Sequence, residues 1–181
     1  MKKMNSIWDE YENIELIGSG SFADVYRAKN KITNEYVAIK EIKKSNINVD
    51  DILKEIEIMK KLESENSVSL IDTIETEDCY YLILELCYIS LEDYIKMRKE
   101  PLSIEEIREV LLELNECFKE MKNKNIIHRN LKPSNILLSN KLTINKICFK
   151  ISDFGLSKLI GRSKINKLSY KELQLQCHLK F

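Results

Sequence analysis

The chain lacks an excess of charge of either sign, a paired-cysteine motif and a long apolar run. Lys plus Arg equals Asp plus Glu at 29 each, so no net field favours nucleic acid or a membrane surface as a partner. The five cysteines are scattered with no CxxC pair, which predicts reduced apolar cysteines rather than a zinc site or a disulfide framework. No stretch approaches a membrane span, and residues 1–16 have no continuous apolar core. We therefore expect a cytoplasmic or nuclear protein.

The composition is that of a soluble globular protein. Hydrophobic residues make up 44% of the sequence and charged residues 32%, a balance that allows a buried core. With 181 residues, the chain is long enough for one ordinary domain or for two small lobes.

The first half of the sequence predicts strands interrupted by one helix. The helix is expected over residues 50–63, where apolar side chains recur at helical spacing on one face: Ile52, Leu53, Ile56, Met59 and Leu62. The expected strands cover residues 11–18, 23–30, 35–42, 68–76 and 79–86, and we expect them to form one five-stranded antiparallel sheet.

The second half is mainly helical. A short helix is expected over residues 91–98 and a long one over residues 104–124, with Ser103 and Glu106 at the spacing of a capping box. Short strands are expected over residues 136–138 and 148–152. The long helix carries an apolar stripe that we expect to pack into the core, made of Ile104, Ile107, Leu111, Leu114, Phe118 and Met121.

A polar loop lies between these helices and strands. Residues 126–135 spell IIHRNLKPSN, a composition suited to holding charged groups, and DFG follows at residues 153–155. Near the N-terminus, residues 18–25 spell GSGSFADV and residues 37–40 spell VAIK. The glycine pattern alone is also compatible with a flexible hairpin turn. A dinucleotide-binding fold is not favoured, because VYRAKNK after the glycines predicts a strand and not a helix.

Taken together, these motifs resemble those of the eukaryotic protein kinases over residues 14–158. The resemblance implies an α+β, two-lobed protein-kinase-like fold. Residues 1–86 would form the N-lobe with the glycine loop, the VAIK strand and the helix called αC. Residues 87–158 would form part of the C-lobe, with the hinge, two helices, the catalytic loop and DFG. The form HRxLKPSN is that of the Ser/Thr-directed members.

The resemblance also implies a site for ATP and Mg²⁺. Lys40, otherwise a plausible surface charge, would hold the phosphates together with Glu55, although Glu57 is an alternative for the αC glutamate. Lys132 would touch the γ-phosphate, and Asn135 and Asp153 would bind the metal. Backbone at the glycine turn would approach the phosphates, and the remaining contacts to nucleotide would come from Ile17, Gly18, Gly20, Val25, Ala38, Glu85, Cys87 and Leu137, with Leu84 as gatekeeper.

The chain departs from the family at Asn130, where active members have an aspartate. An amide cannot accept the proton of the substrate hydroxyl, and no carboxylate lies within residues 126–135. Losing a positioned general base costs on the order of 10² to 10⁴ in rate, so we expect a pseudokinase. Three alternatives stay open: a working Ser/Thr kinase, a binding module that changes shape with nucleotide and acts on a protein partner, and a product without function. His128 is expected to pack rather than to shuttle protons.

The last residues do not continue the family pattern. No APE segment follows DFG, so we expect a truncated C-lobe whose apolar helix stripe is left partly exposed. Residues 159–181 are expected to be an aberrant tail. In a shifted reading frame beginning across Lys171 and Glu172, the possible codons permit GTPxxMSPEI, which favours an out-of-frame tail; the alternative is a chance match.

Overall fold

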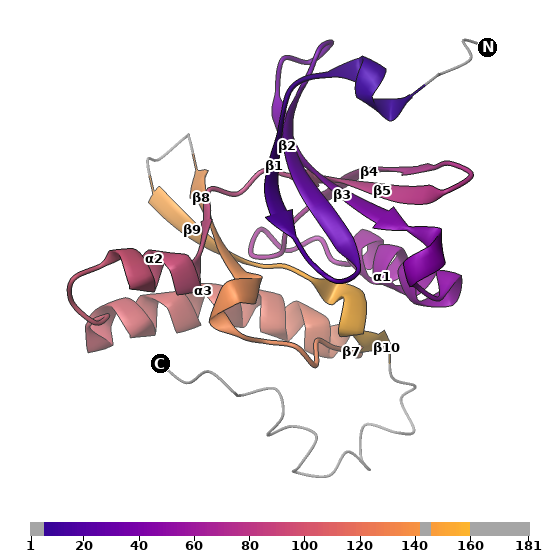
Figure 1. Ribbon diagram of the computed structural model, residues 1–181. Helices are drawn as coiled ribbons and strands as arrows, with labels where there is room; N and C mark the ends of the chain where they lie inside the picture. Colours follow the sequence, from indigo (N-terminus) through magenta and orange to yellow (C-terminus); the bar gives the residue numbers. More distant parts are fainter. Residues whose placement is uncertain (1–5, 142–145, 160–181) are drawn as a thin grey trace. The chain divides into compact units, whose positions relative to one another are not determined.

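The computed structural model describes residues 6–141 and 146–159, which fall into two compact units (Figure 1). The first unit takes the chain up to residue 52 together with residues 69–86, and the second takes residues 53–68 and the chain from residue 87 onward. The boundary expected at residue 86 falls where the first unit ends, whereas residues 53–68, expected with the N-lobe, group with the second unit.

The first unit is built on a five-stranded antiparallel sheet, as predicted. Its strand order is β1-β2-β3-β5-β4, so each strand pairs with its sequence neighbour except where β5 separates β3 from β4. The observed strand ends lie within two residues of the expected ones. The strands are β1 (Tyr11–Ser19), β2 (Ala23–Asn30), β3 (Tyr36–Lys43), β4 (Leu70–Glu75) and β5 (Cys79–Glu85).

One face of this sheet is covered by an apolar and aromatic cluster. A short 3-10 helix, Ile7–Glu10, places the Trp8 ring edge-on to Tyr26 at 5.0 Å and to Tyr81 at 5.9 Å between ring centroids. Because side chains alternate along a strand, the opposite face carries Ala38 and Lys40 of β3. The buried members of the cluster are Ile7, Tyr11, Ala28, Val37, Ile39, Cys79, Tyr81 and Ile83.

The second unit contains the helices and the polar loop. Helix α1 (Val49–Lys61) begins in the first unit and continues into the second, and α2 (Leu91–Met97) and α3 (Ile104–Asn123) follow. The strands β6 (Ile89–Ser90), β8 (Ile136–Lys141) and β9 (Lys146–Ile151) form one small sheet. A second pair joins β7 (Ile126–Ile127) to β10 (Lys158–Leu159). No helix among the described residues combines the length and the apolar character needed to cross a membrane.

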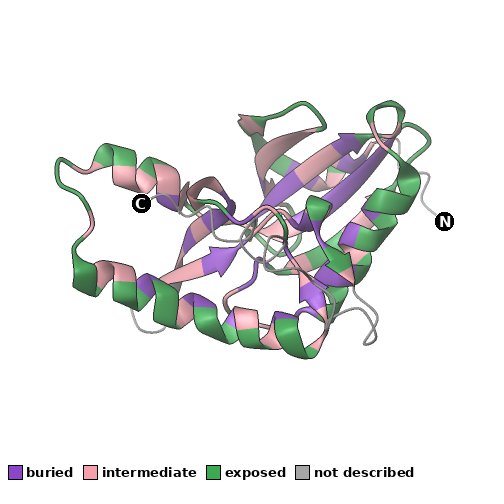
Figure 2. Cartoon of the chain, turned by 90° about the horizontal axis from the view of Figure 1, so that it is seen from below, coloured by how far each residue is buried: buried purple, intermediate pink, exposed green. Residues whose placement is uncertain are grey.

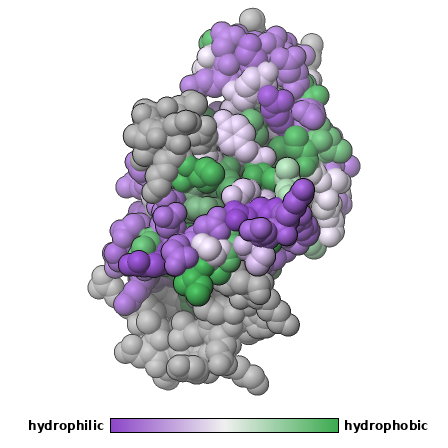
Figure 3. All heavy atoms as spheres, turned by 90° about the vertical axis from the view of Figure 1, so that its left-hand side faces the viewer, coloured by the Kyte–Doolittle hydropathy of each residue, from purple (hydrophilic) through white to green (hydrophobic). Residues whose placement is uncertain are grey.

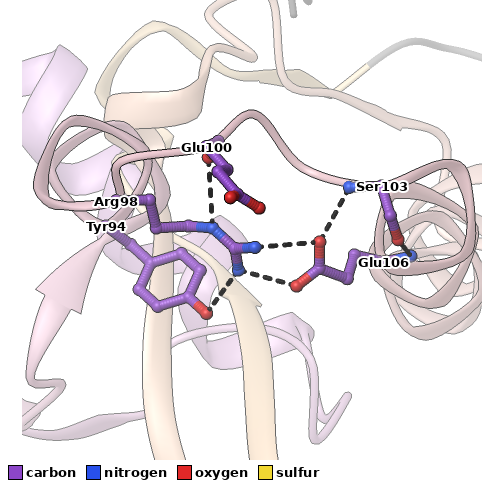
Figure 4. Close-up of polar contacts among 5 residues, drawn as sticks. All are labelled: Tyr94, Arg98, Glu100, Ser103 and Glu106. Atoms are coloured by element: carbon purple, nitrogen blue, oxygen red, sulfur yellow. Dashed lines mark hydrogen bonds and ion pairs between the residues drawn. The ribbon is translucent and has the colours of Figure 1, made fainter.

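The connection between α2 and α3 is organised around Arg98 (Figure 4). Its guanidinium donates to the Tyr94 hydroxyl at 3.0 Å, to the Glu100 carbonyl at 3.4 Å and to the two carboxylate oxygens of Glu106 at 2.6 and 3.2 Å. Glu106 also accepts the Ser103 backbone N–H, while Ser103 caps the helix, so the predicted capping box is confirmed. The backbone N–H of Ser103, followed by Arg98, holds the pKa of the Glu106 carboxyl below its usual value.

The buried stripe of α3 differs from the predicted one (Figure 2). Leu114 and Met121 are buried as predicted, whereas Ile104 is 80% and Leu111 42% exposed. These two residues therefore do not pack into the core, and the stripe is left partly exposed, as we also expected. The helix packs mainly against β9 and β7 and buries a narrow face against them. The buried residues of that face are Val110, Leu114, Cys117 and Met121. Leu114 and Met121 belong to the predicted stripe, whereas Val110 and Cys117 each lie one residue before a predicted position.

The buried face of helix α1 also matches the predicted face only in part. Leu53 is 50% exposed although it was expected in the apolar face, whereas Ile58 is 1% and Glu55 3% exposed. Ile52 and Met59 are buried as predicted, but a buried glutamate breaks the rule that charged side chains mark the solvent side of a helix, which is why periodicity missed part of the face.

On the face of the molecule shown in Figure 3, hydrophilic side chains predominate among the described residues and hydrophobic ones form smaller groups between them. The predicted aberrant tail, residues 159–181, lies outside the described residues except for Leu159, which pairs with Ile126 in the β10–β7 ladder.

Candidate functional site

The polar loop, residues 126–135, is connected to the segment around DFG by strand pairing and by a side-chain hydrogen bond, and each segment contains a residue with left-handed backbone. Before the loop turns, Ile127 pairs with Lys158. Arg129 then adopts a left-handed conformation with φ of 65°, and its Nε donates to the Leu156 carbonyl at 2.6 Å. Asp153 is also left-handed, with φ of 62°. Such conformations are unfavourable for non-glycine residues and persist where surrounding contacts hold them, often at functional sites.

His128 links the same two segments. Its Nε2 lies 2.9 Å from the Ser152 carbonyl oxygen, and its Nδ1 accepts the Asn130 backbone N–H at 3.3 Å. A carbonyl oxygen only accepts, so Nε2 carries the proton and the ring is neutral. Burial lowers the pKa of His128, and the ring meets Phe154 edge-on at 5.1 Å. The imidazole is therefore a buried hydrogen-bonding link between the loop and DFG.

Three polar side chains meet beside this histidine. The Asn130 side-chain amide donates to Asp153 Oδ2 at 3.2 Å, and the Asn135 amide donates to the same oxygen at 3.4 Å. Asn135 Nδ2 also donates to the Asn130 carbonyl at 2.8 Å. A carboxylate is only an acceptor, so both amides must turn their NH₂ groups toward Asp153. The structure thus brings together the base position and both expected metal ligands.

Asn135 is fixed by its own backbone as well as by its side chain. It ends a 3-10 turn, Pro133–Asn135, and is 7% exposed. Its carbonyl accepts from the Ser152 N–H at 2.9 Å and from the Ser152 hydroxyl at 3.1 Å, which holds the turn against the residue before Asp153. Lys132 lies at the start of the turn with its side chain exposed.

Glu55 of α1 lies against the glycine of DFG. A Cβ built on Gly155 would lie 3.2 Å from Glu55 Oε2 and 3.5 Å from Asp153 Oδ1. Because Gly155 has no side chain, the buried Glu55 carboxylate can lie directly beside the backbone of DFG. The alternative residue, Glu57, is exposed and pairs with Lys61 at 2.6 Å across one helical turn.

In the first unit, three of the expected nucleotide residues lie in one row across the sheet. Gly18 of β1 pairs with Val25 of β2, and Val25 pairs with Lys40 of β3. Opposed residues of antiparallel strands share a face, so Gly18, Val25 and Lys40 lie on the same face of this sheet. Ala38 lies two residues from Lys40 on that face and pairs with Leu84. The Gly20 N–H donates to the Ala23 carbonyl at 2.9 Å across the turn.

The remaining expected residues lie at the edges of these groups. Ile17 falls in an irregularity of the β1–β2 ladder and is 48% exposed. Glu85 pairs with Val37, and its carboxylate accepts the Ser69 N–H at 2.7 Å. In the second unit, Leu137 of β8 pairs with Ser90 of β6, and Cys87 is half-buried.

Two serines around DFG were not expected to contribute to the site. Ser152 binds both His128 and Asn135 through its backbone, and the Ser157 hydroxyl donates to the His128 carbonyl at 3.2 Å. The run KISDFGLSK contains both residues, but only the folded chain shows that each contacts a residue more than fifteen positions away.

The donor chemistry of this group suits magnesium. Mg²⁺ binds hard oxygen ligands, usually one or two carboxylates with phosphate oxygens and water. Asp153 supplies a carboxylate, and Asn135 keeps an amide oxygen because its NH₂ is the atom that faces Asp153. The residues present therefore fit the ion that the resemblance implies.

Comparison with known proteins assigns this arrangement to a family. The model of the protein kinase domain matches residues 11–173. Serine/threonine-protein kinase ULK1 of Homo sapiens is 38% identical over 159 residues, which are 83% of this chain but 15% of that protein. The match therefore spans a small part of the relative's length. From the five-stranded sheet, the DFG segment and this match, the chain belongs to the protein kinase domain family, with its similarity directed to a Ser/Thr member.

Proposed function

We propose that this chain binds ATP with Mg²⁺ and transfers the γ-phosphoryl group to Ser or Thr side chains slowly or not at all. In this proposal Lys40 and Glu55 hold the phosphates, Asp153 and Asn135 hold the ion, and Lys132 contacts the γ-phosphate. The first unit supplies Gly18, Val25 and Lys40 on one face of its sheet. The second unit supplies Asp153 and Asn135, already in contact with each other.

One observation carries the loss of turnover: the position of the general base is occupied by an amide that is engaged elsewhere. Asn130 directs its NH₂ to Asp153 Oδ2 at 3.2 Å, so its side chain acts as a donor. Phosphoryl transfer depends on positioning and charge neutralisation, with a carboxylate orienting the acceptor hydroxyl. An amide supplies neither a charge nor a proton acceptor, while the nucleotide contacts do not require the base.

A phosphoryl-transfer assay with a generic Ser/Thr substrate tests this loss. We expect Asn130→Asp to raise the rate by on the order of 10² to 10⁴, the usual contribution of a positioned general base. Asn115→Asp, the same replacement at an exposed position of α3, is the control and should leave the rate unchanged. Robust turnover by the parent chain that Asn130→Asp does not increase would contradict the proposal.

Nucleotide binding is tested separately by thermal unfolding with Mg-ATP. A ligand that binds the native state stabilises it, by about 2.7 kcal/mol at one hundred times the dissociation constant. We expect such a shift in the parent chain and its loss in Lys40→Met. Lys43→Met, at an exposed position of the same strand, is the matched control and should keep the shift. No stabilisation of the parent chain at millimolar Mg-ATP would contradict nucleotide binding.

A further inference from the structure

One face of helix α3 is left uncovered by the rest of the second unit, and exposed residues recur along the whole helix in Figure 2. The buried residues of α3 recur at intervals of three and four, so they share one side of the helix. Because a helix turns by about 100° per residue, a second set with the same intervals lies on the opposite side. We call this set the α3 stripe, and all its members are exposed: Glu105, Arg108, Leu112, Glu116 and Lys119.

Leu112 lies at the middle of the α3 stripe and is 57% exposed. A single exposed leucine is ordinary on a protein surface, but the charges on its two sides make this one unusual. Arg108 lies four residues before Leu112 and Glu116 four residues after it. Glu105 lies seven residues before Leu112 and Lys119 seven residues after it. At equal distances from Leu112, the stripe therefore carries charges of opposite sign.

Such a stripe is complementary to itself when one copy is turned end to end. In an antiparallel pair with a two-fold axis at Leu112, Arg108 of each copy faces Glu116 of the other. Glu105 of each copy faces Lys119 of the other in the same pair. Each of these contacts occurs twice, because a two-fold interface repeats every contact. In a parallel pair each charge would face its own counterpart, and like charges across an interface repel.

The side chains of the stripe are available to a second copy. Glu116 and Lys119 form an ion pair with each other at 2.7 Å, and their side chains are 64% and 59% exposed. An ion pair in water contributes little to stability, so exchanging its partners costs little. Leu111, which is 42% exposed, borders the stripe beside Leu112. An apolar centre with charges around it is also the usual composition of an interface between proteins.

We propose that a second copy of this chain binds to the α3 stripe, and that the two chains form an antiparallel dimer with Leu112 on the two-fold axis. The charge pattern selects a second copy as the occupant, because the stripe matches itself. The proposal does not depend on nucleotide binding, since no residue of the stripe belongs to the proposed nucleotide site. A single pair of helices buries less than the roughly 1,200 Å² of a stable interface, so we expect a weak dimer with a dissociation constant on the order of 100 μM.

Sedimentation equilibrium of the full chain, from micromolar to millimolar concentration, tests for the dimer. We expect a reversible change from monomer to dimer, which high salt weakens by screening the charge pairs. Leu112→Asp should abolish the dimer, because it places two like charges at the axis. Ile32→Asp changes an 83% exposed isoleucine of the first unit and should dimerise like the parent chain. A monomer at every concentration, or a dimer that Leu112→Asp leaves unchanged, would overturn the proposal.

Charge reversal tests the antiparallel arrangement. Arg108→Glu and Glu116→Arg each create two repulsive contacts in their own dimer, so each variant alone should dimerise at least about tenfold more weakly than the parent chain. The control Lys60→Glu, at an exposed position of α1, changes the net charge as Arg108→Glu does and should dimerise like the parent chain.

A mixture of Arg108→Glu and Glu116→Arg gives the decisive result. In the mixed dimer every facing pair again has opposite charges, so we expect the two variants to associate with each other more tightly than either does with itself. Only folded chains can form this dimer, so its formation also excludes misfolding as the cause of the losses in the single variants. A mixture that associates no more tightly than the separate variants would contradict the antiparallel arrangement.

Discussion

The glycine turn of the first unit and the polar loop of the second both carry family motifs, but they are held in different ways. The turn between β1 and β2 is exposed: Phe22 at its tip is 65% exposed, and its cross-turn contacts are the Gly20 N–H to Ala23 bond and a Ser19–Asp24 side-chain bond at 2.6 Å. The polar loop is instead bound to DFG through His128 and Asn135, both buried.

This difference shows where a single substitution changes chemistry without changing structure. In the polar loop, Asn130 is bonded through its backbone N–H to His128 and through its side chain to Asp153, so its position is fixed although it cannot accept a proton. In the exposed turn, few contacts hold any one side chain in place, so the freedom of the backbone matters more than which residue occupies a position. Replacing the same residue type in both regions tests this contrast.

The largest difference in stability between the two regions is expected when a phenylalanine in each is replaced by alanine. Phe154 is 1% exposed and packs against His128, so Phe154→Ala should lower the free energy of unfolding by about 3 to 5 kcal/mol, the usual cost of emptying a buried phenylalanine site. Phe22→Ala, at the exposed tip, should change it by no more than about 0.5 kcal/mol. Denaturant unfolding measures both. Similar losses in the two variants would remove the contrast between the regions.

The pH dependence of stability should depend on the same buried histidine. Burial lowers the pKa of native His128 below its ordinary value of 6.5, so the unfolded chain binds a proton that the native chain does not. The contribution of His128 to the free energy of unfolding is therefore largest above pH 6.5. It decreases as the pH drops below 6.5, with a slope of at most about 1.4 kcal/mol per pH unit for one proton.

His128→Phe isolates this contribution. It removes the titrating ring, so the slope between pH 6.5 and the carboxylate range near 4.5 should flatten, although loss of the ring's hydrogen bonds lowers stability at every pH. Urea unfolding at a series of pH values gives both slopes. An unchanged slope in the variant would mean that another group produces the pH dependence.

The sequence predicted the elements better than the contacts between them. All five strands of the sheet and the three α-helices follow from hydrophobic period and capping residues such as Ser103. The two-residue strands β6, β7 and β10 are too short to show a hydrophobic period, and they form because segments distant in the sequence pair with each other. Likewise, the motif marked Asn130 as unusual, but its bond to Asp153 joins residues 23 positions apart and required the folded chain.

The buried faces of the helices were predicted only in part: Ile52 and Met59 of α1 and Leu114 and Met121 of α3 are buried as expected. On α1 the buried face includes Glu55, which a hydrophobic pattern assigns to solvent, and on α3 the long Ile104 and Leu111 side chains are exposed while smaller Cys117 is buried. The pattern identifies an amphipathic helix, whereas the neighbouring elements decide which of its apolar residues are covered.

Replacing a glycine by alanine in each region should give a smaller difference in stability than replacing a phenylalanine. Gly155→Ala would bring its Cβ to 3.2 Å from Glu55 Oε2, closer than ordinary contact, and the buried carboxylate has to shift. We expect a loss of about 1 to 3 kcal/mol, typical of overpacking. At Gly20 a Cβ would lie 3.6 Å from the Ala23 carbonyl, so Gly20→Ala should be neutral or slightly stabilising, by up to about 1 kcal/mol. Thermal unfolding of both variants decides, and a larger loss at Gly20 would contradict the assignment of the tighter approach to Gly155.

The smallest difference in stability between the two regions is expected when a serine in each is replaced by alanine. The Ser157 hydroxyl is buried and donates to the His128 carbonyl at 3.2 Å, so Ser157→Ala leaves that carbonyl without this donor and should cost about 0.5 to 1.5 kcal/mol. Ser21 is exposed in the glycine turn, and Ser21→Ala should be nearly neutral. Hydrogen exchange adds a local readout, because loss of the Ser157 bond should speed exchange of the Lys158 amide in the short β7–β10 ladder relative to amides of the sheet. Unchanged exchange there, together with unchanged stability, would show that the polar loop is held by His128 and Asn135 without help from Ser157.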